Sequence, residues 1–137
     1  MTIYCDDSSA KKIVERALEK PICEPFRGLL IRNNNHAIIG AIVFNNYEGS
    51  NVYFTCVMSG GPRGSISMKD ARYVARYVFK QLGCRRCTAI TSELNMAARR
   101  ALLQLGFKFE GRLREHFDEA DGLVYGILRS EQKIARI

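Results

Sequence analysis

The sequence lacks several features that would place it in a special class of protein. Its longest apolar run is far shorter than the ~20 residues that a membrane-spanning helix needs, so we expect no membrane partner. The N-terminus, Met1–Asp7, has no basic region followed by an apolar stretch, so we expect no signal peptide and a cytoplasmic location. There is no internal repeat, low-complexity tract or linker. The 137 residues fit one domain with one core, and we expect it to span residues 1–137.

Cysteine is present, but not in a pattern that predicts a disulfide framework. The five cysteines are odd in number and lie mostly in apolar surroundings, so we expect reduced thiols. Cys84-Arg85-Arg86-Cys87 has Cys-x-x-Cys spacing, but it follows an expected helix and enters an expected strand, the reverse of a redox motif. A structural zinc site needs four ligands, and no second pair lies at a suitable spacing. We therefore expect no metal.

Acidic residues are too few to balance the basic ones. The 21 Lys and Arg residues exceed the 14 Asp and Glu residues, and the formal net charge is +7. This excess predicts attraction to polyanions, which include nucleic acids and the phosphates of a nucleotide-containing cofactor. Arg72, Arg76 and Lys80 form a basic stripe on an expected helix. The stripe is most simply a solvated face, although it could attract nucleic acid. No stacking set of aromatics like that of RNA-binding sheets accompanies it.

The first half of the chain predicts a helix followed by three strands. Apolar residues share one stripe of a helix over Ser8–Leu18, with a serine at its start as the cap. Apolar and β-branched residues then concentrate at Arg27–Arg32, His36–Phe44 and Asn51–Met58. Because the turns between these strands are short, we expect an antiparallel meander.

The second half alternates helices and strands. Apolar residues repeat with a helical period over Met68–Leu82, and Gly83 follows the helix end. A strand after this helix suggests a parallel crossover, and Asn95 can cap a further helix. The strands expected in this half are Cys87–Ser92, Gly111–Phe117 and Leu123–Leu128. The order predicts an α/β or α+β single sheet with helices on its faces, followed by a polar tail, Arg129–Ile137, that we expect to fray.

A Gly-rich segment, Ser59–Ser67, joins an expected strand to an expected helix. Its glycines allow successive N–H groups to point inward, the helix start carries positive partial charge, and Arg63 adds a cation suited to phosphate oxygens. These parts suit a pyrophosphate, although the spacing matches neither the nucleotide P-loop nor the Gly-x-Gly-x-x-Gly pattern. A plain surface loop with Ser67 as helix cap explains this segment equally well.

A second segment, Asn95–Arg112, reads Asn-Met-Ala-Ala-Arg-Arg-Ala-Leu-Leu-Gln-Leu-Gly-Phe-Lys-Phe-Glu-Gly-Arg. Taken alone, it is a capped helix with an aromatic plug. With the Gly-rich segment and the ending Val124–Glu131, its order and spacing resemble the GNAT superfamily of acyl-CoA-dependent N-acyltransferases. The resemblance runs from about Arg27 to Glu131. Within the superfamily the chain looks most like phage-encoded members and the branch that contains ribosomal-protein N-terminal acetyltransferases.

The resemblance implies a particular architecture. The α/β (α+β) fold would have a single mixed, mostly antiparallel sheet that splays at a central parallel pair and is flanked by helices. Residues 1–25 would form a shortened N-terminal helical part, and residues 130–137 would form the polar tail. A phage origin would place the protein in the cytoplasm of the host.

The resemblance also implies a site for acetyl-CoA. In the superfamily the pantetheine arm hydrogen-bonds to the splayed strand like an extra strand, and the pyrophosphate lies on the Gly-rich loop. An Asn at the following strand–helix junction bonds the pantetheine or a nearby water. The residues that would hold the cofactor here are Cys56, Val57 and Met58 on the strand, Arg63, Gly64, Ser65, Ile66 and Ser67 on the loop, and Asn95, Ala98 and Arg99 or Arg100 on the next helix.

The chain departs from the superfamily pattern at two positions. The usual loop reads Gln/Arg-x-x-Gly-x-Gly/Ala, whereas Arg63 is followed directly by Gly64. Many members carry a tyrosine four residues before the Gly-Phe pair, and this tyrosine protonates the departing thiolate. That position is Leu102 here, so no general acid is carried over.

The catalytic residues stay unassigned. An attacking amine must lose a proton to a base or through water, and a backbone N–H near Val57 or Met58 could stabilise the carbonyl oxygen. Each candidate base is most simply a solvated surface charge, and each candidate acid is most simply a core or rim tyrosine. The candidate bases are Glu48, Glu93, Glu115 and His116, and the candidate acids are Tyr53 and Tyr125.

The expected function is N-acetyl transfer from acetyl-CoA to a primary amine by direct attack in a ternary complex. The acceptor is unknown, and the positive charge disfavours a strongly cationic one. The alternative is a non-catalytic module on the same fold that binds CoA or nucleic acid. The exposed last strands could pair across a homodimer.

Overall fold

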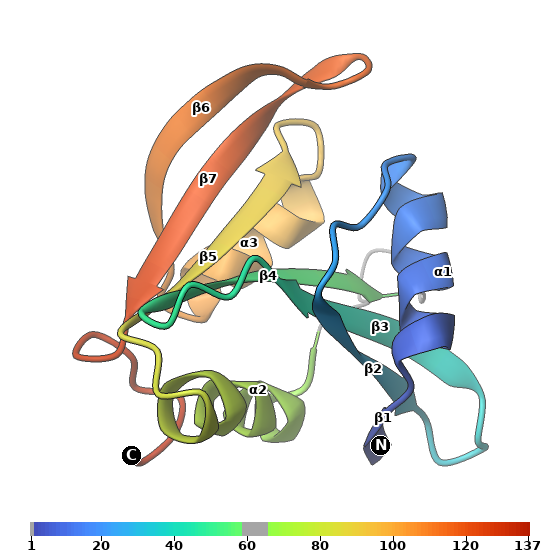
Figure 1. Ribbon diagram of the computed structural model, residues 1–137, viewed down its shortest axis with the longest axis vertical. Coiled ribbons are helices and arrows are strands. Elements are labelled where there is room, and N and C mark those ends of the chain that lie inside the picture. Colours follow the sequence, from blue (N-terminus) through green and yellow to red (C-terminus); the bar gives the residue numbers. More distant parts are fainter. Residues whose placement is uncertain (1, 59–65) are drawn as a thin grey trace. The chain divides into compact units, whose positions relative to one another are not determined.

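A computed structural model describes residues 2–58 and 66–137 of the chain (Figure 1). The chain forms two compact units. The first comprises Met1–Tyr47 with Phe54–Gly64, and the second comprises Glu48–Tyr53 with Ser65–Ile137. One strand, β4 (Asn51–Met58), contributes its first residues to the second unit and its last residues to the first.

The strands form a seven-stranded mixed sheet in the order β1-β2-β3-β4-β5-β7-β6. Strands β4 and β5 are parallel, with Asn51–Tyr53 opposite Arg86–Thr88. The pairings of β1 with β2, β2 with β3, β5 with β7, and β6 with β7 are antiparallel. This sheet confirms the GNAT-like fold class and the parallel crossover. Besides β4, its strands are β1 (Thr2–Cys5), β2 (Phe26–Arg32), β3 (Ile38–Asn45), β5 (Arg86–Ser92), β6 (Lys108–Phe117) and β7 (Ala120–Leu128).

In the first unit, helix α1 (Asp7–Leu18) packs on β2 and β3. Its buried side chains join apolar residues of both strands in one core, which consists of Ala10, Val14, Leu30, Ala41 and Val43. The cap is Asp6, whose carboxylate accepts a hydrogen bond from the Ser9 N–H at 3.1 Å. The expected serine cap is therefore wrong, because an aspartate just upstream satisfies the same N–H groups.

Contact between helix α1 and strand β2 depends on a glycine. The Gly28 N–H donates to the Asp7 carboxylate at 2.7 Å, and its carbonyl accepts from the Asp6 N–H at 3.0 Å. A Cβ at Gly28 would lie 2.7 Å from the Cβ of Ala10 and 2.9 Å from the Cα of Asp7. The helix start can therefore approach the strand only where no side chain intervenes.

In the second unit, β6 and β7 form a long curved hairpin, with β7 beside β5 (Figure 1). Two helical segments precede the hairpin. Helix α2 (Met68–Arg76) continues into a π-helical turn, Tyr77–Gln81, and helix α3 (Met96–Gln104) follows β5. Gly83 and Gly106 follow these helices with φ of 70° and 96°, where glycine avoids the strain of a side chain.

The C-terminal segment differs from the frayed tail expected from its polarity. The side-chain amide of Gln132 donates to the Ala135 carbonyl at 2.8 Å and accepts from the Ile134 and Ala135 N–H groups at 3.0 Å each. These bonds close a local turn that polarity alone does not reveal.

No helix in the described part of the chain is long and apolar enough to cross a membrane. Within residues 2–58 and 66–137, His, Cys, Asp and Glu side chains form no group of three or more that could hold a metal ion.

Candidate functional site

The end of strand β4 carries the three residues expected to meet the pantetheine arm. Cys56, Val57 and Met58 are each partly buried in the first unit. Val57 packs against the core of that unit. A Cβ at Gly40 would overlap the sulfur of Met58, so Met58 lies directly against the backbone of β3. The three residues follow the segment of β4 that pairs with β5, which ends at Tyr53.

The Gly-rich segment leads into helix α2. Arg63, Gly64 and Ser65 lie outside the described residues. The hydroxyl of Ser67 accepts a hydrogen bond from the Asp70 N–H at 3.1 Å and donates to the Asp70 carboxylate at 2.9 Å. Asp70 is only 2% exposed. Ser67 is therefore the helix cap that the sequence suggests, and it fixes the start of α2 immediately after the Gly-rich segment.

The start of helix α3 positions the residues expected beside the cofactor in the second unit. The side-chain oxygen of Asn95 accepts a hydrogen bond from the Ala98 N–H at 3.1 Å, which confirms the expected cap. The amide NH₂ of Asn95 is a further donor on the same exposed side chain. The Arg99 guanidinium donates to the Glu93 carbonyl at 3.0 Å and to the Met96 sulfur at 3.2 Å, so it is held across the first turn. Arg100 is exposed.

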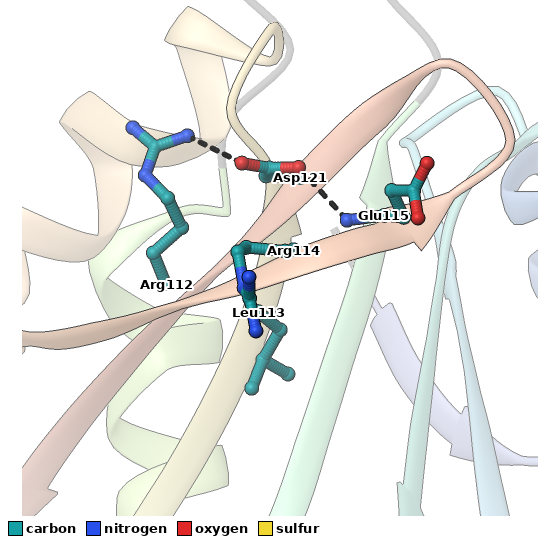
Figure 2. A pocket seen from close by; sticks show the side chains of 5 residues that line it. All are labelled: Arg112, Leu113, Arg114, Glu115 and Asp121. Carbon is teal, nitrogen blue, oxygen red and sulfur yellow. Dashed lines mark hydrogen bonds and ion pairs between the residues drawn. The ribbon is translucent and has the colours of Figure 1, made fainter.

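A hollow of about 720 Å³ opens on the β6–β7 hairpin (Figure 2). Its lining residues are Arg112, Leu113, Arg114, Glu115 and Asp121. The Asp121 carboxylate accepts from the Arg112 guanidinium at 3.0 Å and from the Glu115 N–H at 2.8 Å. Figure 2 shows these two donors on opposite ends of that carboxylate.

Glu93 completes the charged group at this hollow. Its carboxylate lies 2.8 Å from the Arg112 guanidinium and 2.9 Å from the Asp121 N–H. The Glu115 N–H and then the Arg112 guanidinium lower the pKa of Asp121. Hydrogen bonding to Asp121 raises the pKa of Arg112. Arg112 and Asp121 were not among the site residues predicted from the sequence. The only signal for them was an acidic turn beside basic residues of the preceding strand.

The candidate catalysts lie in different settings within the second unit. Glu48 is exposed, and Glu93 is bonded to Arg112 and Asp121. The ring of His116 packs edge-on against Phe117 with centroids 4.9 Å apart. Tyr125 is 2% exposed and packs edge-on against Phe109 at 5.8 Å, which is the setting of a core tyrosine. Glu115 is the candidate base that lines the hollow with an exposed side chain.

The Cys-x-x-Cys pair is buried. Cys84 and Cys87 are 0% and 3% exposed, and all five cysteines are thiols. Burial raises the pKa of Cys87 to about 12 and also raises the pKa of Cys84. Because the thiolate is the reactive form, this pair does not have the environment of a redox motif.

A polar network ties the start of β4 to β5 and β6. The Thr88 hydroxyl donates to the Asn51 side-chain oxygen at 2.8 Å, and Arg86 donates to Thr88 at 3.0 Å and to Glu110 at 2.8 Å. The hydrogen bond to Glu110 raises the pKa of Arg86. Asn51 and Thr88 are 9% and 3% exposed. The network therefore satisfies buried polar groups next to the parallel pairing.

No family model and no curated protein matches the chain. Solved structures do. A mutant form of the spermidine N-acetyltransferase SpeG from Vibrio cholerae aligns with a TM-score of 0.76 at 14% identity, covering 95% of this chain and 96% of that one. A dodecameric structure of spermidine N-acetyltransferase from Vibrio cholerae aligns with a TM-score of 0.75 at 15% identity, and the alignment covers 94% of each chain. A probable acetyltransferase aligns with a TM-score of 0.66 at 20% identity, and the alignment covers 77% of this chain and 61% of that one. This chain therefore shares their fold.

Proposed function

We propose that this protein is an N-acetyltransferase that moves an acetyl group from acetyl-CoA to a primary amine. The observation that carries the proposal is the likeness in fold to a spermidine N-acetyltransferase over 95% of the chain. Two local features agree with it. A Gly-rich segment runs directly into a helix capped by Ser67, and Asn95 caps the next helix at the end of β5. Local caps alone would also suit a fold with another use, so only the combination supports the proposal.

Each group proposed to hold a nucleotide-containing thioester has chemistry suited to its part of that cofactor. The N–H groups at the start of α2 that are not bonded to Ser67 are natural donors to a pyrophosphate, and Arg63 and Gly64 of the preceding loop would add to them. Asn95 keeps its amide NH₂ available because its oxygen forms the cap. Backbone groups of Cys56, Val57 and Met58 would hold the pantetheine arm. Ala98 would pack beside the cofactor, and Arg99 or Arg100 would approach the 3′-phosphate. The cofactor supplies the activated acetyl group.

The chemistry requires positioning more than a dedicated acid. Holding an amine next to a thioester removes much of the entropic barrier, and a backbone N–H near Val57 or Met58 would stabilise the carbonyl oxygen. Leu102, which is 6% exposed, replaces the tyrosine acid of the superfamily. Proton removal through water, or by an exposed carboxylate such as Glu48 or Glu115, meets the remaining need. Glu93 suits this role less, because Arg112 already holds its carboxylate.

The net charge of the chain favours one class of amine as the acceptor. The related solved structures are named for spermidine, but a net charge of +7 raises the cost of gathering a polycation. We therefore propose a neutral or monovalent amine, such as a peptide N-terminus. The exposed edge strand β6 is where we place a homodimer contact, since one of the related structures is an oligomer.

The experiment is a thiol-release assay with acetyl-CoA and a panel of amines. The panel should contain spermidine, lysine, an aminoglycoside and peptides with free N-termini. Release that depends on one class of amine, with the acetylated product seen by mass spectrometry, supports the proposal. The second candidate is a non-catalytic CoA-binding module, which Leu102 favours. Saturable acetyl-CoA binding with no release across the panel selects that candidate.

A further inference from the structure

Two adjoining hollows on the second unit share one arginine, Arg76. The first, which we call the basic hollow, has a volume of about 510 Å³ and lies between α2 and the C-terminal segment. Its lining residues are Arg72, Arg76, Lys133, Ile134, Ala135 and Arg136. The second, which we call the tyrosine hollow, has a volume of about 420 Å³ and is lined by Tyr73, Arg76, Tyr77, Lys80 and Gln81. Figure 1 shows the C-terminus beside α2. None of the described residues proposed for acetyl-CoA lines either hollow.

The helix supplies two rows of side chains to these hollows. Arg72, Arg76 and Lys80 follow one another at four-residue intervals and are exposed. Tyr73 and Tyr77 have the same interval, and Tyr73 is 45% exposed. Residues four apart on a helix are neighbours, so a row of cations runs beside a row of rings. The π-helical turn begins at Tyr77, and such turns are frequent at functional sites.

The remaining cations come from the C-terminal segment, which forms a hydrogen-bonded turn. The three hydrogen bonds of the Gln132 side chain fold residues 132–135. The preceding residue, Glu131, accepts from the Leu128 N–H at 3.1 Å and pairs with Lys108. Lys133 and Arg136 are therefore carried on an ordered segment, and both line the basic hollow.

No carboxylate in the described part of the chain balances the charge of the basic hollow. Its three arginines and one lysine form no ion pair with any carboxylate of residues 2–58 or 66–137. Like charges four residues apart destabilise a helix by a few tenths of a kcal/mol, and an anion relieves that repulsion. Guanidinium groups match phosphate oxygens in geometry as well as charge.

We propose that these hollows bind single-stranded nucleic acid. The phosphates occupy the basic hollow, and a base stacks on Tyr73 in the neighbouring one. Basic grooves beside aromatic rings are the usual means of holding single strands without sequence preference. An acidic peptide would satisfy the cations but would leave the tyrosine hollow without a matching group. The residues that line the two hollows include none of the described residues proposed for acetyl-CoA, so the chain binds both ligands.

Fluorescence anisotropy with labelled oligo-U and oligo-dT tests this inference. Two matched pairs of substitutions remove the cations from either side: Arg72→Gln with Arg76→Gln on the helix, and Lys133→Gln with Arg136→Gln on the tail. The control pair is Lys12→Gln with Arg16→Gln on α1, which matches the helix pair in its four-residue spacing and in exposure. Each site pair should weaken binding about tenfold and reduce the slope of log Kd against log salt by about 1.4, or 0.7 for each phosphate that is no longer neutralised. The control pair should change binding less than about twofold.

Tyr73 distinguishes a site for single strands from a general cation patch. Tyr73→Ala should weaken oligonucleotide binding about fivefold or more, and Tyr73→Phe should restore it because the ring is kept. Equal losses in the site pairs and the control pair would overturn the inference. So would tighter binding of duplex, or equal competition by poly-glutamate. Each variant should keep the thermal shift that acetyl-CoA gives to the parent protein. A missing acetyl-CoA shift in the parent contradicts the proposed enzyme function without affecting the oligonucleotide result.

Discussion

Glu93 and Arg112 form an ion pair in which a carboxylate oxygen lies 2.8 Å from the guanidinium. The same carboxylate accepts the Asp121 N–H at 2.9 Å, so Glu93 joins the end of β5 to both strands of the hairpin. A carboxylate held in this way is poorly placed to take a proton from a substrate amine. Glu93 is therefore better explained as a brace for the hairpin than as a general base.

Glu93→Gln tests that assignment. The amide still accepts the Asp121 N–H but loses the charge that pairs with Arg112, so the melting temperature should fall slightly. The pH dependence of kcat/KM in the thiol-release assay should not change, because the group that titrates is elsewhere. A loss of activity of about 100-fold or more with an unchanged fold would identify Glu93 as the base after all.

The Asp121 carboxylate makes stability depend on pH in acid. Its pKa is lowered in the folded protein by the Glu115 N–H and the Arg112 guanidinium. The stabilisation is therefore complete above the unfolded pKa of about 3.9 and is lost as the pH falls through the lower folded value. The melting temperature of Asp121→Asn should be below that of the parent at pH 7, and the difference should shrink below about pH 4. A difference that stays constant with pH would contradict a role for the charge.

Asn95 has two functions that one substitution separates. Asn95→Asp keeps an oxygen acceptor for the Ala98 N–H but removes the NH₂ proposed to serve the cofactor. Its stability should stay within about 0.5 kcal/mol of the parent, while the KM for acetyl-CoA should rise. Asn95→Ala should show the same rise and also lose about 1 kcal/mol from the free energy of unfolding. If Asn95→Asp keeps the parent KM, the residue is a cap and nothing more.

A side chain at Gly28 should destabilise the protein, because it would push α1 away from β2. A Cβ there meets the backbone of Asp7 at 2.9 Å, which cannot move as a flexible side chain would. Gly28→Ala should lower the free energy of unfolding by about 1–3 kcal/mol, measured by urea denaturation. The matched control is Gly111→Ala in β6, where a Cβ meets nothing within 4 Å. Equal effects in the two variants would show that the α1–β2 contact is not the cause.

The cysteines should differ in reactivity. Cys5 and Cys23 are exposed, whereas Cys84 and Cys87 are buried, and burial raises the pKa of Cys87 to about 12. Native-state alkylation at pH 8 followed by mass spectrometry should label the exposed pair first and the buried pair only after denaturation. Early labelling of Cys87 would reopen the question of a redox role.

Features with local signals could be predicted from the sequence. The period of apolar residues located α2, and the Ser67 and Asn95 caps follow from residue type and position. Strand β1 was missed because Thr2–Cys5 is short and exists through its antiparallel pairing with β2, far along the chain. The Asp6 cap was missed because two serines just downstream fit the same rule.

The groups that give the surface its chemistry come from distant segments. Glu93 and Asp121 are 28 residues apart, and Glu93 and Arg112 are 19 apart. The basic hollow joins α2 to the C-terminal turn. Charged residues have no period that reveals such partners, so only the fold brings them together. The stripe on α2 was visible in the sequence, but its partners in the tail were not.

The most direct test of the central claim is the melting temperature of the protein with and without acetyl-CoA. A single site at a ligand concentration of one hundred times Kd stabilises the folded state by about 2.7 kcal/mol. We predict a saturable rise in melting temperature with acetyl-CoA, and a smaller rise when Arg63 is replaced by alanine. No rise at millimolar acetyl-CoA would contradict the proposed site and the transfer reaction that depends on it.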